Sequence, residues 1–410
     1  MPEMREPKYG QPFPKSEYVD RIKRIRKSMT SAGLDAVILA RQENLEYSSG
    51  FTHASWLAGF RDFTQQVVIF ADPEIEPVLV APCDLQGCFA TSAVSDIRPV
   101  RDLTPAGNYR VLLDALSPLC EKPSIGIENP PDGRPSLPQS FIDGLEKDVG
   151  AELSDCTELM DRVRMIKSPR EIELFREACR ITSEAVEAGV KAVSAGVSEA
   201  EIANVIALEM VRLSGNCFAS SPWFVYVYSD GKCPVAWDGV ASDYRFKKGD
   251  CVYIDAGYRR YGYYADMIRI VSIGEPEPEK KKIFEASREV NHEVINFMRP
   301  GIKCSEVYRR LYETYEKLGY KKEIDEALNG GFVCEGHGIG LSVHEPPFIV
   351  PDCDIILEPG MTMSVEPNLF LGFPFETTRV ALKPENNILI TENGCEVLST
   401  TPDSMRIAAI

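Results

Sequence analysis

The chain has 410 residues, enough for two domains that each bury a core of their own. Hydrophobic residues make up 44% and charged residues 26%, as in ordinary globular proteins, and no apolar run is long enough for a transmembrane helix. The net charge of −17 disfavours nucleic acids and anionic membranes as partners, because both are polyanions.

The cysteines and the N-terminus predict a cytoplasmic protein. None of the twelve cysteines forms a Cys-x-x-Cys pair, which argues against zinc fingers and the common redox motif. Most of them lie in apolar stretches, as buried reduced thiols do. The N-terminal Met-Pro-Glu-Met-Arg-Glu-Pro-Lys has no apolar segment behind its charges, so we expect no secretory signal.

A small α/β domain is predicted over residues 1–163. Its helices are recognised by apolar residues at helical spacing, and its strands by short apolar runs next to turn residues. The expected elements, in chain order, are a helix over 17–33, a strand over 36–40, a hairpin of strands 66–70 and 77–81, a helix over 109–118, a strand over 125–127 and a helix over 140–147.

The second domain, predicted over 164–410, opens at a clear helix start. Ser168-Pro169-Arg-Glu171 is a capping box with proline at the first helical position, and Ser198-Glu-Ala-Glu201 begins a second helix in a similar way. The stretch from Gly196 resembles the stretch from Gly301, which suggests two αα-β halves related by a pseudo-twofold, with ligands converging between them. Chance similarity is the alternative, because a glycine turn and a first-turn acid are common at helix starts.

Five side chains that can bind metal lie in the second domain, each in its own short motif. They are Asp255 in Ile-Asp-Ala-Gly, Asp266 in Ala-Asp-Met-Ile-Arg, His337 in Gly-His-Gly-Ile-Gly, Glu366 in Ser-Val-Glu-Pro-Asn and Glu376 in Phe-Glu-Thr-Thr-Arg. Four carboxylates and one imidazole suit Mn, Co, Fe or Zn. One divalent ion does not balance four carboxylates, so two ions about 3.5 Å apart are expected. The sequence therefore predicts a dinuclear metallohydrolase.

The local patterns indicate how these side chains are held. Asp255 follows a strand pattern and Asp266 follows a turn, so the two aspartates are expected on paired antiparallel strands. Buried aspartates facing each other require a cation or hydrogen bonds, and the alternative is a pair of surface carboxylates beside a hairpin. The glycines around His337 let the backbone approach closely, although a lone histidine is more often structural.

The order of these motifs resembles that of the metallopeptidases with the pita-bread fold, namely methionine aminopeptidase, aminopeptidase P and prolidase. The stretches 238–257 and 336–346 look most like the prolidase and aminopeptidase P branch, and the first half resembles the creatinase-type N-terminal domain. The resemblance implies an α+β protein with a pita-bread catalytic domain over 164–410 and a smaller creatinase-like α/β domain over 1–163. It also implies hydrolysis of a peptide bond next to proline, by an Xaa-Pro dipeptidase or aminopeptidase.

The resemblance also assigns roles within the site. Glu366 would bind metal and act as general base, Glu376 would bridge both ions with Arg379 as its partner, and His344 would contact the substrate and steady the tetrahedral intermediate. The alternatives are a solvated strand residue for Arg379 and a satisfied core histidine for His344.

A loop in the first domain is also expected to contribute. In the resembling branch this loop of one subunit reaches the active site of the other, which predicts a homodimer. Its candidate substrate-binding residues are His53, Trp56 and Arg61.

One position departs from the branch. Asp238, next to Trp237, stands where prolidase-like sequences have a substrate-gripping histidine, and Ile268 replaces a usual threonine. An ionised aspartate cannot donate to a developing oxyanion, but it could hold a cationic group of the substrate. The change favours an alternative, a non-peptidase enzyme of the same fold that cleaves a C–N or C–S bond in a small metabolite. It could also be a turn cap before Gly239. A third possibility is an inactive metal-binding or structural relative.

Overall fold

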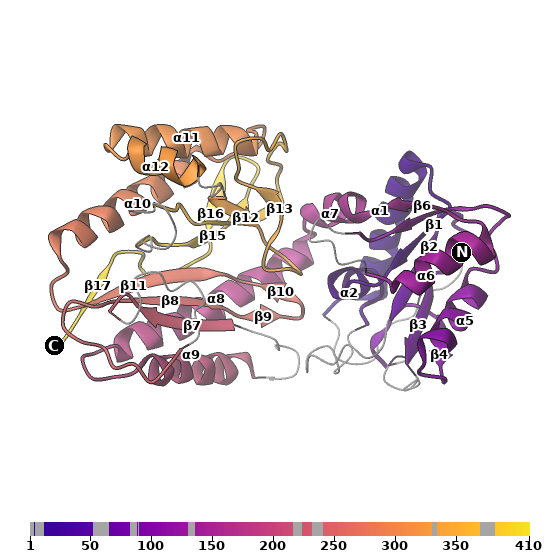
Figure 1. Ribbon diagram of the computed structural model, residues 1–410, viewed down its shortest axis with the longest axis horizontal. Coiled ribbons are helices and arrows are strands. Elements are labelled where there is room, and N and C mark those ends of the chain that lie inside the picture. Colours follow the sequence, from indigo (N-terminus) through magenta and orange to yellow (C-terminus); the bar gives the residue numbers. More distant parts are fainter. Residues whose placement is uncertain are drawn as a thin grey trace. The chain divides into compact units, whose positions relative to one another are not determined.

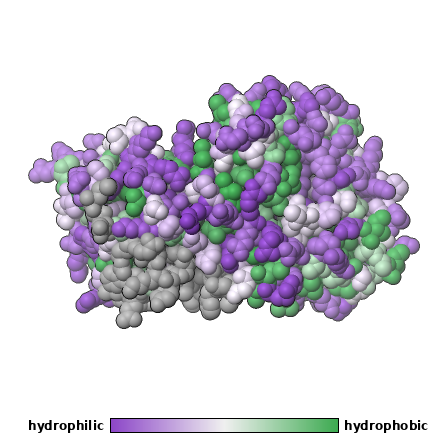
Figure 2. Space-filling model, turned by 180° about the vertical axis from the view of Figure 1, so that it is seen from behind, coloured by the Kyte–Doolittle hydropathy of each residue, from purple (hydrophilic) through white to green (hydrophobic). Residues whose placement is uncertain are grey.

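The structure is a computed structural model that describes residues 4, 12–51, 65–82, 88, 90–129, 136–215, 224–231, 241–329, 334–369 and 382–410. The chain divides into two compact units, Met1–Arg164 and Met165–Ile410. Within the described ranges, no helix is long and apolar enough to cross a membrane. The face in Figure 2 is largely hydrophilic, with its hydrophobic side chains in interrupted patches.

The first unit is built on a six-stranded mixed sheet with the strand order β4-β3-β2-β1-β5-β6. β1 pairs antiparallel with β2 and parallel with β5, and β2 and β3 form the expected antiparallel hairpin. The strands are β1 (Ala36–Leu39), β2 (Gln66–Phe70), β3 (Val78–Pro82), β4 (Asp96–Val100), β5 (Ser124–Ile127) and β6 (Glu152–Asp155). The helices are α1 (Lys15–Ala32), α2 (Gln42–Ser49), α5 (Pro105–Ala115), α6 (Gln139–Gly144) with a π-helical turn over Leu145–Val149, and α7 (Thr157–Met165).

Helix α5 differs from the prediction of a helix over 109–118. It begins four residues earlier, because the Thr104 side chain accepts a hydrogen bond from the Gly107 N–H and Pro105 occupies the first turn. It ends at Ala115, three residues early. The cap was readable in the sequence, whereas the apolar spacing alone placed the helix too late.

The second unit consists of two sheets with helices on their outer faces (Figure 1). One sheet has the order β17-β11-β8-β7 and the other β13-β12-β14-β15-β16. The strands are β7 (Phe224–Ser229), β8 (Cys251–Gly257), β11 (Met267–Ile273), β12 (Gly336–Gly338), β13 (Glu345–Phe348), β14 (Thr362–Val365), β15 (Asn386–Ile390), β16 (Cys395–Val397) and β17 (Arg406–Ala408), with β9 (Arg259–Arg260) and β10 (Tyr263–Tyr264) as a separate short ribbon.

Helices α8 (Pro169–Ala192) and α9 (Glu199–Ser214) cover the first of these sheets. α10 (Pro278–Phe297), α11 (Cys304–Lys317) and α12 (Lys321–Asn329) belong to the second. The capping boxes of Ser168 and Ser198 are both formed, so α8 and α9 begin where the sequence predicted. Each helix layer packs an apolar core against its sheet, and a smaller apolar cluster joins Tyr253 and Ile270 of the first sheet to Phe284 of α10.

The predicted repeat is confirmed by backbone hydrogen bonds at two equivalent junctions, each joining a helix start to a later segment. Both junctions follow a glycine with positive φ, Gly196 at 85° and Gly301 at 88°. The first junction has hydrogen bonds from Gly196 N to Phe246 O, Phe246 N to Val197 O, Glu199 N to Tyr244 O and Ala200 N to Ser242 O. The second has them from Gly301 N to Leu357 O, Leu357 N to Ile302 O, Cys304 N to Ile355 O and Ser305 N to Cys353 O. The two halves therefore repeat one supersecondary unit.

Candidate metal centre

Four of the five predicted ligands converge between the two sheets. Asp255 lies on β8 and Asp266 immediately precedes β11, and these strands are antiparallel, as expected. His337 lies on β12, and Glu366 follows β14 directly. The first sheet thus supplies both aspartates and the second sheet supplies the histidine and the glutamate.

Glu385, which the sequence reasoning missed, completes the cluster. It immediately precedes β15, and β15 pairs with β14 so that Val365 lies opposite Asn386. This pairing brings the two glutamates next to each other. Potential ligand atoms lie within 4.8 Å of one another in three overlapping groups: Asp255, Asp266 and Glu385; His337, Glu366 and Glu385; and Asp266, His337 and His344.

His337 is the centre of this arrangement. Its Nδ1 lies 3.0 Å from the carbonyl oxygen of Gly338, so Nδ1–H donates there and the Nε2 lone pair faces the carboxylates. Nε2 is 3.8 Å from Asp266 Oδ2, 3.6 Å from Glu366 Oε1 and 3.9 Å from Glu385 Oε1. These distances are too long for hydrogen bonds. Two atoms that are each about 2.1 Å from one ion lie at most about 4.2 Å apart, so the spacing fits a shared metal.

Several ligand atoms are buried without a hydrogen-bond partner among the described residues. They are Asp255 Oδ1, Asp266 Oδ1 and His337 Nε2. A buried polar atom left unpaired costs about 1–3 kcal/mol, so such atoms cluster where something else satisfies them. The donor set and these atoms together fit divalent metal ions.

The raised pKa values of the buried carboxyl groups also indicate a site for cations. Burial, together with the Glu366 carboxylate, raises the pKa of Asp255 to about 7. Burial and the neighbouring carboxylates also raise the pKa values of Asp266 and Glu385 well above the ordinary range. Burial lowers the pKa of His337 to about 4, so its imidazole is neutral and able to ligate near pH 7.

Lys383 is a second residue that the sequence reasoning did not single out. Its buried ammonium donates to Glu366 Oε2 at 2.5 Å and to Asn368 Oδ1 at 2.6 Å. Burial opposes the charge of both partners. Even so, the Glu366 and Glu385 carboxylates raise the pKa of Lys383, and the Lys383 charge lowers the pKa of Glu366. Glu366 is therefore held as a carboxylate.

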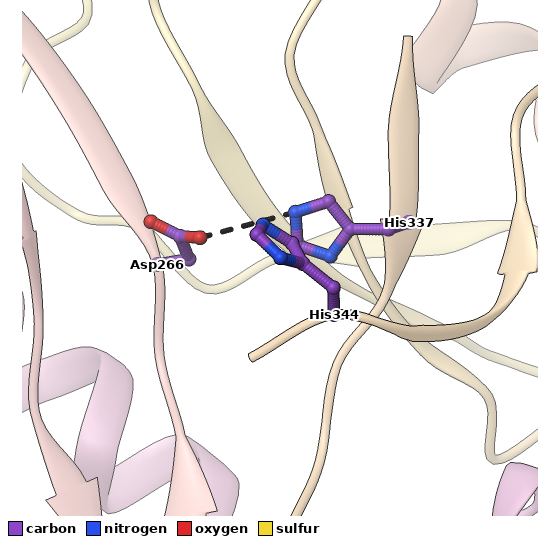
Figure 3. Close-up of side chains that lie close together, drawn as sticks. All are labelled: Asp266, His337 and His344. Atoms are coloured by element: carbon purple, nitrogen blue, oxygen red, sulfur yellow. Dashed lines mark ion pairs between the residues drawn. The ribbon is translucent and has the colours of Figure 1, made fainter. Parts of the chain in front are cut away.

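His344 lies at the edge of the cluster. Its ring is exposed and stands edge-on to the His337 ring, with centroids 4.3 Å apart (Figure 3). The segment that carries it is anchored by the next residue, Glu345, whose Oε1 accepts a 2.8 Å hydrogen bond from the buried Lys167 ammonium. The exposed ring is thus open to a substrate on one side and faces the ligand cluster on the other.

The polar residues behind the cluster hold its backbone in place. Asn387 Oδ1 accepts from the Asp266 N–H at 3.0 Å, and its amide donates to the Asp266 carbonyl oxygen. The Ser364 hydroxyl donates to Glu385 Oε1 at 2.7 Å. The remaining residues singled out from the sequence lie outside the described residues: Glu376, Arg379, Trp237, Asp238, His53, Trp56 and Arg61.

Comparisons with known proteins identify both units. The metallopeptidase family M24 matches residues 173–392, and the creatinase/prolidase N-terminal domain matches residues 21–166. The Xaa-Pro dipeptidase of Pyrococcus horikoshii is 28% identical over 384 residues, which cover 93% of this chain and 97% of that protein. The Xaa-Pro dipeptidase of Pyrococcus furiosus is 26% identical over 383 residues, covering 93% and 98%.

Solved structures confirm the expected fold. The prolidase from Pyrococcus horikoshii matches with a TM-score of 0.75 at 24% identity, covering 94% of this chain and 99% of that one. The dipeptidase PepE from Mycobacterium ulcerans matches with a TM-score of 0.77 at 23% identity, covering 97% and 100%. The chain therefore belongs to metallopeptidase family M24, with a creatinase/prolidase N-terminal domain preceding its catalytic unit.

Proposed function

We propose that this metallohydrolase is an Xaa-Pro dipeptidase or aminopeptidase that works with two divalent ions held by Asp255, Asp266, His337, Glu366 and Glu385. The observation that carries the proposal is the set of three carboxylates 3.6–3.9 Å from the unpaired Nε2 of His337. The oxygen-rich ligand set suits Mn, Co, Fe or Zn. When bound, the ions would polarise the scissile carbonyl and make water acidic enough to supply a nucleophile near pH 7.

The protein's own residues support the proton transfers. Glu366 is ionised and only partly buried, with 19% of its side chain exposed, so it can accept a proton from the attacking water. Lys383 holds the second oxygen of Glu366 and so fixes which oxygen faces the water. His344 presents an exposed ring beside the cluster, from which it can donate to the developing oxyanion.

The preference for proline is proposed from the names of the relatives, the Xaa-Pro dipeptidases of two Pyrococcus species. A second candidate is a non-peptidase enzyme of the same fold that cleaves a C–N or C–S bond in a small cationic metabolite. The observation that favours it is the acidic Asp238 in place of a donor. A panel of Xaa-Pro dipeptides and cationic C–N and C–S compounds, assayed with wild type and Asp238→His, separates the two.

Each candidate function makes a different prediction for the Asp238→His variant. If the protein is a peptidase with a modified pocket, wild type cleaves Xaa-Pro dipeptides weakly and the variant cleaves them about tenfold to a hundredfold faster. This factor corresponds to one charged hydrogen bond. Efficient wild-type cleavage that the histidine leaves unchanged or reduces would instead make Asp238 a turn cap. Turnover of only the cationic compounds would support the second candidate.

The metal content is tested first, because every candidate except an inactive relative requires it. The protein would be stripped with a chelator, reloaded with Mn or Co and analysed by elemental mass spectrometry. We expect two ions per chain, with Xaa-Pro hydrolysis restored on reloading. No bound metal after reconstitution would contradict the proposal, and bound metal without any hydrolysis would favour the inactive relative.

We further propose a cytoplasmic homodimer. All nine described cysteines are free thiols, which supports a reducing compartment. The resemblance to the prolidase branch supports the dimer, with the loop containing His53, Trp56 and Arg61 near the partner's site. Analytical ultracentrifugation should give a dimer at micromolar concentration. A monomer at that concentration would rule out the dimer. Loss of substrate affinity without loss of metal in the Trp56→Ala variant would support the role of the loop.

A further inference from the structure

The two junctions of the repeat have the same backbone hydrogen bonds but different side chains. In the first junction, Glu199 Oε2 accepts from the Ser242 hydroxyl at 2.7 Å and from the Ser242 N–H at 3.0 Å. The positions equivalent to Glu199 and Ser242 in the second junction are Cys304 and Cys353, because the same backbone hydrogen bonds run through them. A pair of thiols in the second half thus replaces a side-chain hydrogen bond in the first half.

The two cysteines lie side by side at this junction, because the Ser305 N–H donates to the Cys353 carbonyl oxygen at 2.9 Å and both side chains pack in one apolar cluster. At the equivalent positions of the first junction the two side chains are in contact, since the Ser242 hydroxyl lies 2.7 Å from Glu199 Oε2. Cys304 is the first residue of α11 and is fully buried, whereas Cys353 lies partly exposed in the segment after β13. Backbone N–H groups of Ile355 and Phe348 also face the Cys353 sulfur. The partly exposed thiol is thus close to hydrogen-bond donors, and the buried thiol lies beside it.

The donors change the chemistry of Cys353. The adjacent Cys304 thiol and the two backbone hydrogen bonds outweigh burial and lower the pKa of Cys353 to about 6. Burial has the opposite effect elsewhere, raising the pKa of Cys251 to about 12 and those of Cys334 and Cys395 to about 11. The thiolate is the reactive form, so Cys353 combines the requirements for oxidation, a stabilised thiolate with access to solvent.

We propose that Cys304 and Cys353 form a redox-active dithiol that hydrogen peroxide converts reversibly into a disulfide. The Cys353 thiolate attacks one peroxide oxygen and the O–O bond breaks, which gives a sulfenic acid and a hydroxide ion that is protonated to water. The Cys304 sulfur then loses its proton and attacks the sulfenic sulfur. The S–S bond forms, the S–O bond breaks and a second water leaves. The two thiols lose two electrons and one peroxide is reduced to two waters.

The disulfide would tie the start of α11 to the segment after β13. This segment is connected to the metal cluster, because Phe348 on β13 lies opposite His337 in the strand register. A crosslink between residues 304 and 353 also restricts the unfolded chain. Oxidation is therefore expected to stiffen the second half of the catalytic unit without removing any metal ligand.

Peptide mapping tests the proposal directly. The full-length protein is treated with a small excess of hydrogen peroxide, quenched with catalase, alkylated and digested for mass spectrometry. We expect a linked peptide pair containing Cys304 and Cys353, short of two hydrogens, that disappears after dithiothreitol. Its absence, or linkage of either cysteine mainly to a third one, would overturn the proposal.

Two variants separate the roles of the thiols. In the Cys304→Ser variant the reaction should stop at the sulfenic acid of Cys353, which is detected as a dimedone adduct. In the Cys353→Ser variant the thiol of Cys304 should stay reduced. Cys120→Ser, at an exposed cysteine remote from the pair in sequence, is the matched control and should still form the disulfide. Oxidised wild type should melt about 5 °C or more above reduced wild type, with no such difference in either pair variant. An equal shift in Cys353→Ser would overturn the assignment.

Discussion

The buried ion pair between Lys167 and Glu345 makes a sharp prediction for stability. The two side chains are 2% and 4% exposed, and their charged atoms lie 2.8 Å apart. Lys167 also donates to the Met165 carbonyl oxygen at 3.2 Å. The pair fills the space above Gly340, where an added Cβ would lie 2.4 Å from Glu345 Oε1. Lys167→Met would leave the Glu345 carboxylate buried without its cation.

The expected cost follows from the burial of both partners. Removing one member of a buried pair destabilises by about 3–5 kcal/mol, because the other charge stays desolvated. For a unit of this size each kcal/mol lowers the melting temperature by about 2–4 °C, so a drop of roughly 6–20 °C is expected. The matched control is Lys191→Met, whose partner Glu187 is 3.3 Å away but whose own side chain is 72% exposed. An exposed pair of this kind contributes about 0–1 kcal/mol.

The assay is thermal unfolding of the metal-free full chain, followed by circular dichroism. The double variant Lys167→Met/Glu345→Met should recover most of the loss, since replacing both charges by apolar groups of similar size is close to neutral. Turnover of the reloaded single variant should also fall, because Glu345 holds the segment that carries His344. Melting of Lys167→Met and Lys191→Met within about 2 °C of each other would contradict a large contribution from the buried pair, as would a double variant that is as unstable as the single one.

Three further predictions concern the metal centre. Glu385→Ala should lower the metal content below two ions per chain in elemental analysis, whereas Glu376→Ala should not. The reverse result would make Glu376 the fifth ligand, as predicted from the sequence. Lys383→Met should raise the pKa of Glu366, so the acid limb of the kcat/KM profile should move to higher pH, and an unmoved limb would mean that Lys383 does not act on the base. Mn²⁺ affinity should weaken as the pH falls below about 7, which is the pKa of Asp255 in the metal-free protein. Each proton that must leave before the ion binds lowers the affinity about tenfold per pH unit. Calorimetric titration at several pH values measures this, and an affinity that does not change with pH would contradict it.

The parts of the fold that could be predicted are those with local causes. The starts of α8 and α9 follow from two capping boxes, in which side chain and backbone of one turn satisfy each other. Asp255, Asp266, His337 and Glu366 each lie at the end of an apolar or glycine-rich motif that is recognisable by itself. Their meeting between the sheets could be expected because a repeated unit brings its two halves face to face.

The missed residues have causes that are distant in the chain. Lys383-Pro-Glu385 has the composition of a surface turn, and nothing near it in sequence indicates burial. Glu385 joins the ligands only through the pairing of β14 with β15, and Lys383 becomes a buried cation only because Glu366 and Asn368 lie opposite it. Such residues are visible only once the strand register is known.

The matched junctions have a consequence for how this fold can change. Backbone hydrogen bonds hold both junctions together, so the side chains at the junctions are not needed to define the path of the chain. One copy holds an acid and a hydroxyl there, and the other holds two sulfurs, with the same local backbone. A repeated architecture of this kind contains positions where the two halves can differ in chemistry while the backbone of both follows the same path. The junction of the second half is such a position, because none of the metal ligands belongs to it.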